Sequence, residues 1–182
     1  MFPIRFPYAF APYDFQAQID IEDTAASTSI IEVVSYVDRA MIQRLHDRPN
    51  DLREIDRRVF EELVAELFNG FGYQVELTRQ TKDGGVDVVA LKNDHFKVKF
   101  LIQCKRQNPG NPVALSVVRD LRGVLGSNGN SASKAIIVTT TRLTRDAKRF
   151  VAENEWDLEA KEYDDIHDWI KQYIAARREA PR

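Results

Sequence analysis

The sequence predicts an α/β fold in which a mixed β-sheet is flanked by helices on both faces. Two β-rich apolar runs, residues 86–91 and 98–106, flank a polar segment, which is the pattern of a hairpin. A third run, residues 134–140, is almost continuously apolar, as expected of a central strand covered on both faces. Helical periodicities precede and follow these runs, so the predicted core has the αβββαβ order followed by a last helix.

The composition is that of an ordinary globular protein whose charge is unevenly spread. The 182 residues are 43% hydrophobic and 30% charged, and the formal net charge is −2. Residues 1–56 carry ten acidic and five basic side chains, whereas residues 97–122 carry six basic side chains and one acidic one. Phosphate contacts require such local positive charge, although a solvated basic face has the same composition.

The single cysteine and the lack of long apolar runs bear on the cellular compartment. One cysteine excludes an internal disulfide and fits a reducing environment. No apolar run approaches the roughly 20 residues of a membrane span. We therefore expect a cytoplasmic protein with no membrane partner.

The first fifty residues are expected to form an extended arm and one helix. Residues 1–15 are rich in Phe, Tyr and Pro, and the prolines interrupt both a long helix and a signal-peptide core. Such an arm packs on its own domain, on a second copy or on another protein. Apolar spacing predicts an amphipathic helix over residues 30–45. The expected division is residues 1–50 for arm and helix, 51–175 for the main domain and 176–182 for a tail.

The core elements have recognisable starts and stops. Asp56 is suited to cap a helix over residues 57–69, and a Gly-Phe-Gly sequence then stops it. Residues 73–77 alternate as a first strand, and the Gly-Gly pair of residues 84–85 allows a turn or a close backbone approach. The later elements are a helix over residues 113–125, a helix over residues 145–153 capped by Thr144, an edge strand over residues 156–162 and a last helix capped by Asp164.

Polar side chains occur where buried strands should be apolar. Asp87 opens the second strand, and Gln103 and Lys105, two residues apart on the third, point to the same face. Cys104 points to the opposite, packed face, so we expect a small buried hydrophobe rather than a nucleophile. An aspartate, an amide and an ammonium brought together across a hairpin suit Mg²⁺ and an attacking water. Residue type alone makes Glu61 a solvent-facing acid near the start of its helix.

Four short motifs follow one another in the sequence: residues 60–64 (FEELV), 72–73 (GY), 83–87 (DGGVD) and 103–106 (QCKR). In this order they resemble the Mrr-like restriction endonucleases of the PD-(D/E)xK nuclease superfamily. The resemblance implies a restriction-endonuclease-like fold, with the N-terminal helix and arm added to it. It also implies a Mg²⁺-dependent endonuclease that hydrolyses phosphodiester bonds of double-stranded DNA, in defence against foreign or modified DNA. The likeness extends from about Leu52 to Trp169.

The resemblance also assigns roles to single residues. The catalytic residues would be Glu61, Asp87, Gln103 and Lys105. The ligands of Mg²⁺, or of Mn²⁺ in its place, would be Asp87, Gln103, the backbone carbonyl of Cys104 and Glu61. Gln103 stands where the superfamily usually has Asp or Glu, so the site has one negative charge fewer, which Glu61 would restore. Lys105 would orient or deprotonate the water, or neutralise the transition state. DNA contacts are expected from Gly84, Gly85, Arg106, Arg119, Arg122 and Thr140.

The expected partners follow from the same resemblance. One site cuts one strand, so a homodimer or a higher oligomer is expected, and another chain could supply recognition or regulation. Two alternatives stay open. The first is a non-catalytic module of this fold that binds DNA or a partner, in which Asp87 and Lys105 form a plain ion pair. The second is a junction resolvase of the same superfamily, which differs in the shape of its substrate.

Overall fold

The protein is described by a computed structural model that covers residues 37–78, 85–127 and 131–179. The predicted aromatic arm and residues 30–36 of the predicted first helix lie outside these residues. The described elements are, in order, α1 (Arg39–Asp47), the 3-10 helix η1 (Pro49–Arg53), α2 (Arg57–Gly70), β1 (Gln74–Leu77), β2 (Val88–Asn93), β3 (Lys97–Lys105), α3 (Leu115–Leu125), β4 (Lys134–Thr139), α4 (Arg145–Glu153), β5 (Leu158–Lys161) and α5 (Tyr163–Glu179).

The strands form one mixed sheet in the order β1-β2-β3-β4-β5. The pairs β1–β2 and β2–β3 are antiparallel, whereas β3–β4 and β4–β5 are parallel. This confirms the predicted α/β fold with a mixed sheet, an interior β4 and an edge strand β5. The antiparallel β2–β3 register pairs Val88 with Ile102, which places the segment just before β2 beside the last residues of β3.

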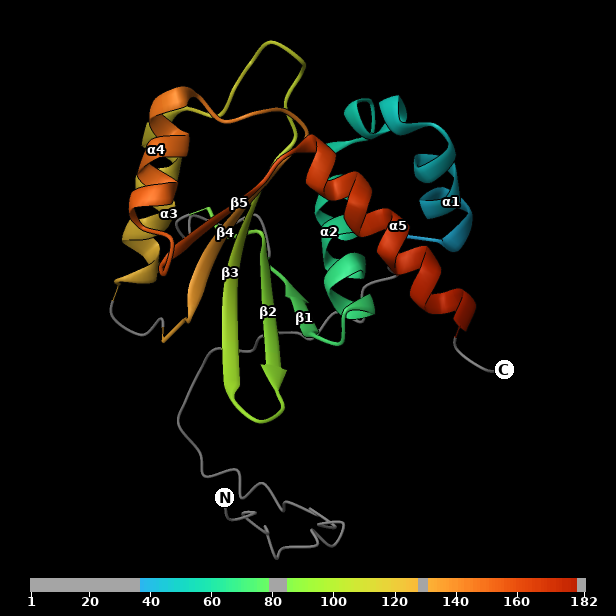
Figure 1. Ribbon diagram of the computed structural model, residues 1–182, viewed down its shortest axis with the longest axis horizontal. Helices are drawn as coiled ribbons and strands as arrows, with labels where there is room; N and C mark the ends of the chain where they lie inside the picture. The colour runs from blue at the N-terminus through green and yellow to red at the C-terminus, as the bar shows by residue number, and fades with distance from the viewer. Residues whose placement is uncertain (1–36, 79–84, 128–130, 180–182) are drawn as a thin grey trace, which may run out of the picture. The chain divides into compact units, whose positions relative to one another are not determined.

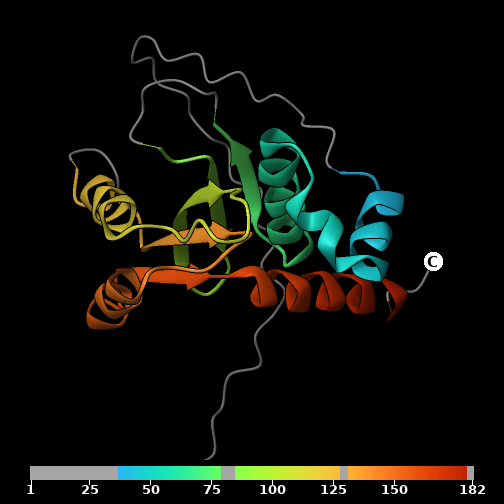
Figure 2. The same cartoon turned by 90° about the horizontal axis from the view of Figure 1, so that it is seen from above.

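Helices cover both faces of the sheet (Figure 1). Helices α1, α2 and α5 lie on one side, and α3 and α4 lie on the other, as the view from above also shows (Figure 2). Each group closes its own hydrophobic cluster, one including Phe60, Ile102 and Ile166 and the other including Leu101, Leu121 and Ala147. Alternating residues of β3 therefore point into different clusters, as strand geometry requires.

Side-chain caps set several helix starts. The Asp56 carboxylate accepts from the Arg58 amide at 2.7 Å, and the Thr144 hydroxyl accepts from the Ala147 amide at 3.3 Å, so both predicted caps are confirmed. Helix α1 begins at Arg39, with Asp38 as its cap, and the predicted start at residue 30 lies outside the described residues. The predicted Asp164 cap was wrong, because α5 begins at Tyr163 and the Asp165 carboxylate accepts from the Glu162 amide at 2.8 Å.

The contact between α2 and α5 depends on a glycine and a buried polar network. The Tyr173 hydroxyl donates to the Glu66 carboxylate, which Arg177 also contacts at 3.2 Å. Burial and this hydrogen bond to Glu66 raise the pKa of Tyr173. A Cβ added at Gly70 would lie 2.4 Å from the Tyr173 ring. The ring cannot simply move away, because its hydroxyl is committed to Glu66.

Gly70→Ala is expected to lower the free energy of unfolding by about 1–3 kcal/mol, because the new methyl overlaps the Tyr173 ring. Gly123→Ala is the matched control, since no heavy atom lies within 4 Å of its added Cβ. That substitution should stabilise α3 by about 0.5–1 kcal/mol through helix propensity. Urea denaturation of both variants measures the difference, and equal effects would contradict this account of the α2–α5 contact.

None of the described helices is both long enough and apolar enough to cross a membrane.

Candidate active site

Asp87 is fixed at the start of β2 by contacts on both sides. Its backbone amide donates to the Ile102 carbonyl at 2.9 Å, and its carbonyl accepts from the Thr78 amide at 3.0 Å. One carboxylate oxygen, Oδ2, accepts from the Cys104 amide at 2.7 Å. The other, Oδ1, faces the Arg57 guanidinium. The sheet therefore fixes the carboxylate at the ends of β1 and β3, where the residue is only 8% exposed.

Helix α2 brings Glu61 to the same place. The side chain is 1% exposed, so the expectation from residue type alone, a solvent-facing acid, was wrong. Its Oε1 lies 3.0 Å from Arg57 Nε, and its Oε2 lies 3.3 Å from Arg58 Nη1. Burial and the neighbouring charge of Asp87 raise the pKa of Glu61, against the opposing effect of the two guanidiniums. Glu61 and Asp87 are called the carboxylate pair below.

Gln103 presents a buried amide oxygen that lacks a hydrogen-bond partner within the described residues. The residue is 6% exposed and lies between Ile102, whose carbonyl accepts from the Asp87 amide, and Cys104, whose amide donates to the Asp87 carboxylate. Its Nε2 lies against Gly85, where an added Cβ would come within 2.4 Å of it. Gly85 has a φ of +81°, in the left-handed region that favours glycine. A buried acceptor without a donor is costly, and a bound cation would satisfy it.

Lys105 ends β3 two residues after Gln103 and is partly exposed. Its backbone carbonyl accepts from the Thr139 hydroxyl at 2.7 Å and from the Thr140 amide at 3.3 Å. These contacts clamp the end of β3 to β4. The side chain makes no hydrogen bond or ion pair within the residues for which contacts are described, so its ammonium has no protein partner among them.

Cys104 points to the opposite face, as expected. It is 1% exposed and packs in the cluster of α1, α2 and α5. Burial and the charge of Asp87 raise the pKa of the thiol well above its ordinary value. The thiol is therefore protonated and enclosed, which confirms a small buried hydrophobe and argues against a nucleophile.

The donor set fits a hard divalent cation. In the part of the chain that the structure describes, no group of three or more His, Cys, Asp and Glu side chains is placed to hold a metal ion. The set here is instead the carboxylate pair with the amide oxygen of Gln103. Carboxylate and amide oxygens are the ligands that Mg²⁺ takes, and the unpartnered oxygen is the observation that a cation would explain. The role of the Cys104 carbonyl stays a prediction.

The structure does not bring every predicted DNA contact to this site. Thr140 is fully buried and its hydroxyl bonds with the backbone of Gln107, so the prediction that it contacts a phosphate was wrong. Arg122 pairs with Asp157 at 2.9 Å, just before β5, at the opposite end of the sheet from Lys105. The guanidinium of Arg119 lies over the Phe150 ring of α4, 5.6 Å from its centroid. The basic face of α3 is therefore not part of the carboxylate site.

The other predicted DNA contacts are those of Arg106, Gly84 and Gly85. Arg106 is partly exposed and donates from Nε to the Ile55 carbonyl at 3.0 Å. This bond ties the end of β3 to the start of α2 and so positions Lys105 relative to Glu61. Gly85 lies against Gln103, and Gly84 lies outside the described residues. A DNA contact by Arg106 or by either glycine stays a prediction.

Sequence reasoning missed Arg57. It lies four residues before Glu61 on α2, and its guanidinium contacts both carboxylates of the pair. The i, i+4 spacing to Glu61 was a readable signal, because such residues share one helix face. The contact with Asp87, 30 residues away, was not readable from sequence.

A comparison with protein families identifies the chain. The Mrr_cat family, described as restriction endonuclease, matches residues 52–170, more than half of the chain. An uncharacterised protein of Sinorhizobium fredii (strain NBRC 101917 / NGR234), y4cE, is 31% identical over 78 residues. That match covers 42% of this chain and 20% of y4cE.

Two solved structures share the fold. The DNA modification-dependent restriction endonuclease AspBHI superimposes with a TM-score of 0.50 and 19% identity, over 75% of this chain and 38% of AspBHI. Restriction endonuclease FokI superimposes with a TM-score of 0.52 and 10% identity, over 71% of this chain and 27% of FokI. The chain thus spans well under half of these relatives. The protein belongs to the Mrr_cat restriction endonuclease family and has the restriction-endonuclease fold.

Proposed function

We propose that the protein is a Mg²⁺-dependent endonuclease that hydrolyses phosphodiester bonds of double-stranded DNA. Mn²⁺ would serve in place of Mg²⁺. The observation that carries the proposal is the buried, unpartnered oxygen of Gln103, on the strand whose next residue binds Asp87, together with the carboxylate pair that Arg57 bridges. Family membership supports the reaction class.

Each residue of the proposed site has a role that follows from the chemistry of its side chain. Glu61, Asp87 and Gln103 supply oxygens that would hold the cation. Bound there, Mg²⁺ would stabilise charge on the phosphoryl oxygens and make water a stronger nucleophile. Lys105 orients the water and places a positive charge beside the phosphate as negative charge develops. The fixed positions of Glu61 on α2 and of Asp87, Gln103 and Lys105 on the sheet support this division of roles.

The biological role we propose is defence against foreign or modified DNA. The neighbour AspBHI is described as dependent on DNA modification, which makes modified DNA the first substrate to test. One such site cuts one strand, so cutting a duplex requires two copies, as a homodimer or a larger assembly. Recognition of the target would come from residues or chains beyond this catalytic unit.

The test is cleavage of methylated and unmethylated plasmid with Mg²⁺, with Asp87→Ala as the inactive control and circular dichroism to confirm its fold. We expect nicked and linear products from the wild type, none from Asp87→Ala, and none after addition of EDTA. Intact binding without cleavage of any DNA would favour a non-catalytic binding module. Cleavage restricted to four-way junctions in a panel of branched and linear DNAs would favour a resolvase.

The raised pKa of Glu61 predicts how metal affinity depends on pH. A proton competes with the cation for this carboxylate, so affinity should be weak below the raised pKa and level off above it. The folded protein binds this proton more tightly than the unfolded chain does. Without metal, the free energy of unfolding therefore falls as pH rises from the ordinary value of 4.5 towards the raised one.

Calorimetric Mn²⁺ titrations between about pH 5 and 8 measure this dependence. In Asp87→Asn, the midpoint of the pH-dependent rise in Mn²⁺ affinity should move to lower pH. The reason is that the charge of Asp87 helps to raise the pKa of Glu61. Glu61→Gln should bind Mn²⁺ more weakly, and its affinity should no longer change with pH in this range. A wild-type affinity that stays flat across this range would contradict the assignment of Glu61 as a ligand.

A further inference from the structure

Arg57 occupies the place where a cation would be held. Its Nε lies 3.0 Å from Glu61 Oε1, and its Nη2 lies 3.4 Å from Asp87 Oδ1. The guanidinium thus bridges the carboxylate pair by one oxygen of each. The Asp87 Oδ1 that it contacts is the oxygen not committed to the Cys104 amide.

The partners in the contact between Arg57 and the carboxylate pair differ in how far they are buried. The Arg57 side chain is 56% exposed, whereas those of Glu61 and Asp87 are 1% and 10% exposed. Hydrogen bonds that the guanidinium donates to the two carboxylates, together with their charges, outweigh burial and raise the pKa of Arg57, so it stays charged. The two acids are fixed by helix α2 and by the sheet. Arg57, near the start of α2, can leave by rotating its own side chain.

We propose that Arg57 is an exchangeable counter-ion of the carboxylate pair, displaced when a divalent cation binds Glu61, Asp87 and Gln103. Two positive groups cannot share the same two oxygens, and only the guanidinium is free to move. Gln103 distinguishes the two occupants, because Arg57 leaves its amide oxygen unpartnered whereas a cation can use it. The displaced guanidinium then binds a phosphate of the DNA backbone beside the site. This last step rests on the proposed nuclease function.

Arg58 provides the matched control. It carries the same charge, lies next in sequence and contacts the same acid, through Glu61 Oε2 at 3.3 Å. Its other contacts are the Thr78 carbonyl and Glu62, and it has no contact with Asp87. A loss of general positive charge would affect the Arg57 and Arg58 variants alike. Release of the bridged oxygens would affect only the Arg57 variant.

The first experiment is a Mn²⁺ titration by calorimetry without DNA, on wild type, Arg57→Gln and Arg58→Gln. We expect Arg57→Gln to bind Mn²⁺ at least about tenfold more tightly, because it removes charge-assisted hydrogen bonds that compete for the ligands. Arg58→Gln should change the affinity by less than about threefold, because Arg58 contacts Glu61 Oε2 and neither of the two oxygens that Arg57 bridges. Equal effects of the two variants, or an unchanged affinity in Arg57→Gln, would overturn the proposal.

The second experiment observes the displacement directly. The Nε–H resonance of Arg57, identified by its loss in Arg57→Gln, is followed by NMR as Mg²⁺ is added. It should move towards the position of a solvent-exposed arginine as the site fills. A resonance that stays unchanged at saturating Mg²⁺ would show that the guanidinium keeps its carboxylate partners, and the counter-ion exchange would be wrong.

The third experiment separates this inference from the proposed function. DNA binding is compared in Lys105→Ala and in the double variant with Arg57→Gln, with and without Mg²⁺. With Mg²⁺, the double variant should bind about tenfold more weakly, and without Mg²⁺ the two should differ by less. Equal binding with Mg²⁺ would overturn the phosphate contact.

Cleavage by the wild type distinguishes failure of the proposed nuclease function from failure of the counter-ion exchange. A wild type that cuts no DNA, combined with the expected Mn²⁺ affinities, would refute the nuclease and support the exchange. A wild type that cuts DNA, combined with unchanged Mn²⁺ affinity in Arg57→Gln, would refute the exchange and leave the nuclease standing.

Discussion

Replacing Lys105 with alanine is expected to reduce DNA cleavage by about 1,000-fold, within the range for loss of a group that acts on the reacting proton or charge. The side chain stands two residues after Gln103 on the same face of β3 and is partly exposed. Its backbone carbonyl is fixed by Thr139 and Thr140, so truncating the side chain should leave the end of the strand in place. The loss should therefore appear in the rate of cleavage rather than in the fold.

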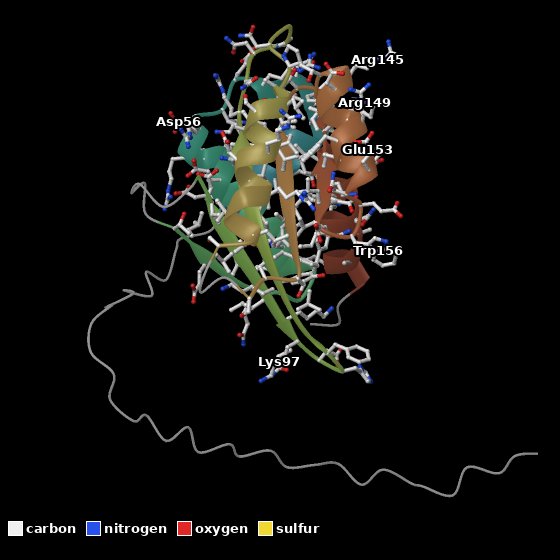
Figure 3. The ribbon with its side chains drawn as sticks, turned by 90° about the vertical axis from the view of Figure 1, so that its left-hand side faces the viewer. Asp56, Lys97, Arg145, Arg149, Glu153 and Trp156 are labelled. Atoms are coloured by element: carbon white, nitrogen blue, oxygen red, sulfur yellow. The ribbon has the colours of Figure 1, made fainter. Side chains whose placement is uncertain are left out.

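Single-turnover cleavage at saturating Mg²⁺ measures this rate. DNA affinity should fall by no more than about tenfold, the effect of one lost phosphate contact. Lys97→Ala is the control, because it removes the same charge from the other end of β3, roughly 26 Å away along the strand. Figure 3 shows Lys97 at the end of the sheet remote from Asp56, the cap of α2. Cleavage by Lys105→Ala at the rate of Lys97→Ala would refute the catalytic role of Lys105.

Gly85→Ala is expected to disable the site through Gln103. The added Cβ would lie 2.4 Å from Gln103 Nε2, so the buried amide must move away from its place beside Asp87. Displacing a supporting contact of this kind typically lowers metal affinity by about 10–100-fold, and cleavage should fall with it. The positive φ of +81° adds strain of about 1–2 kcal/mol, which lowers the free energy of unfolding.

Gly72→Ala separates the two effects of that substitution. Gly72 has a φ of +84°, but its added Cβ would meet no heavy atom within 4 Å. Both variants should therefore lose similar stability in urea denaturation, whereas only Gly85→Ala should lose Mn²⁺ affinity and cleavage. A Gly85→Ala protein that binds Mn²⁺ as tightly as Gly72→Ala does would show that the position of Gln103 is immaterial.

Much of the fold could be predicted because its signals are local. Neighbouring residues alone are enough to predict the Asp56 and Thr144 caps, the alternation of the strands and the apolar run of β4. The structure confirms these features. The errors arose where two local signals competed. Both Asp164 and Asp165 fall inside the first turn of α5, and it is the Asp165 carboxylate that accepts from the Glu162 amide before the helix.

By itself, the sequence determined the order of helices and strands and the positions of Asp87, Gln103 and Lys105 along the strands, because alternation and caps need only a few adjacent residues. The tertiary structure alone decided that Glu61 is buried, that Arg57 bridges it to Asp87, that Thr140 is enclosed and that Arg122 lies at the far end of the sheet. Those outcomes depend on the strand register and on how α2 and α3 pack. Register and packing are set by contacts between residues far apart in sequence, which a local pattern does not contain.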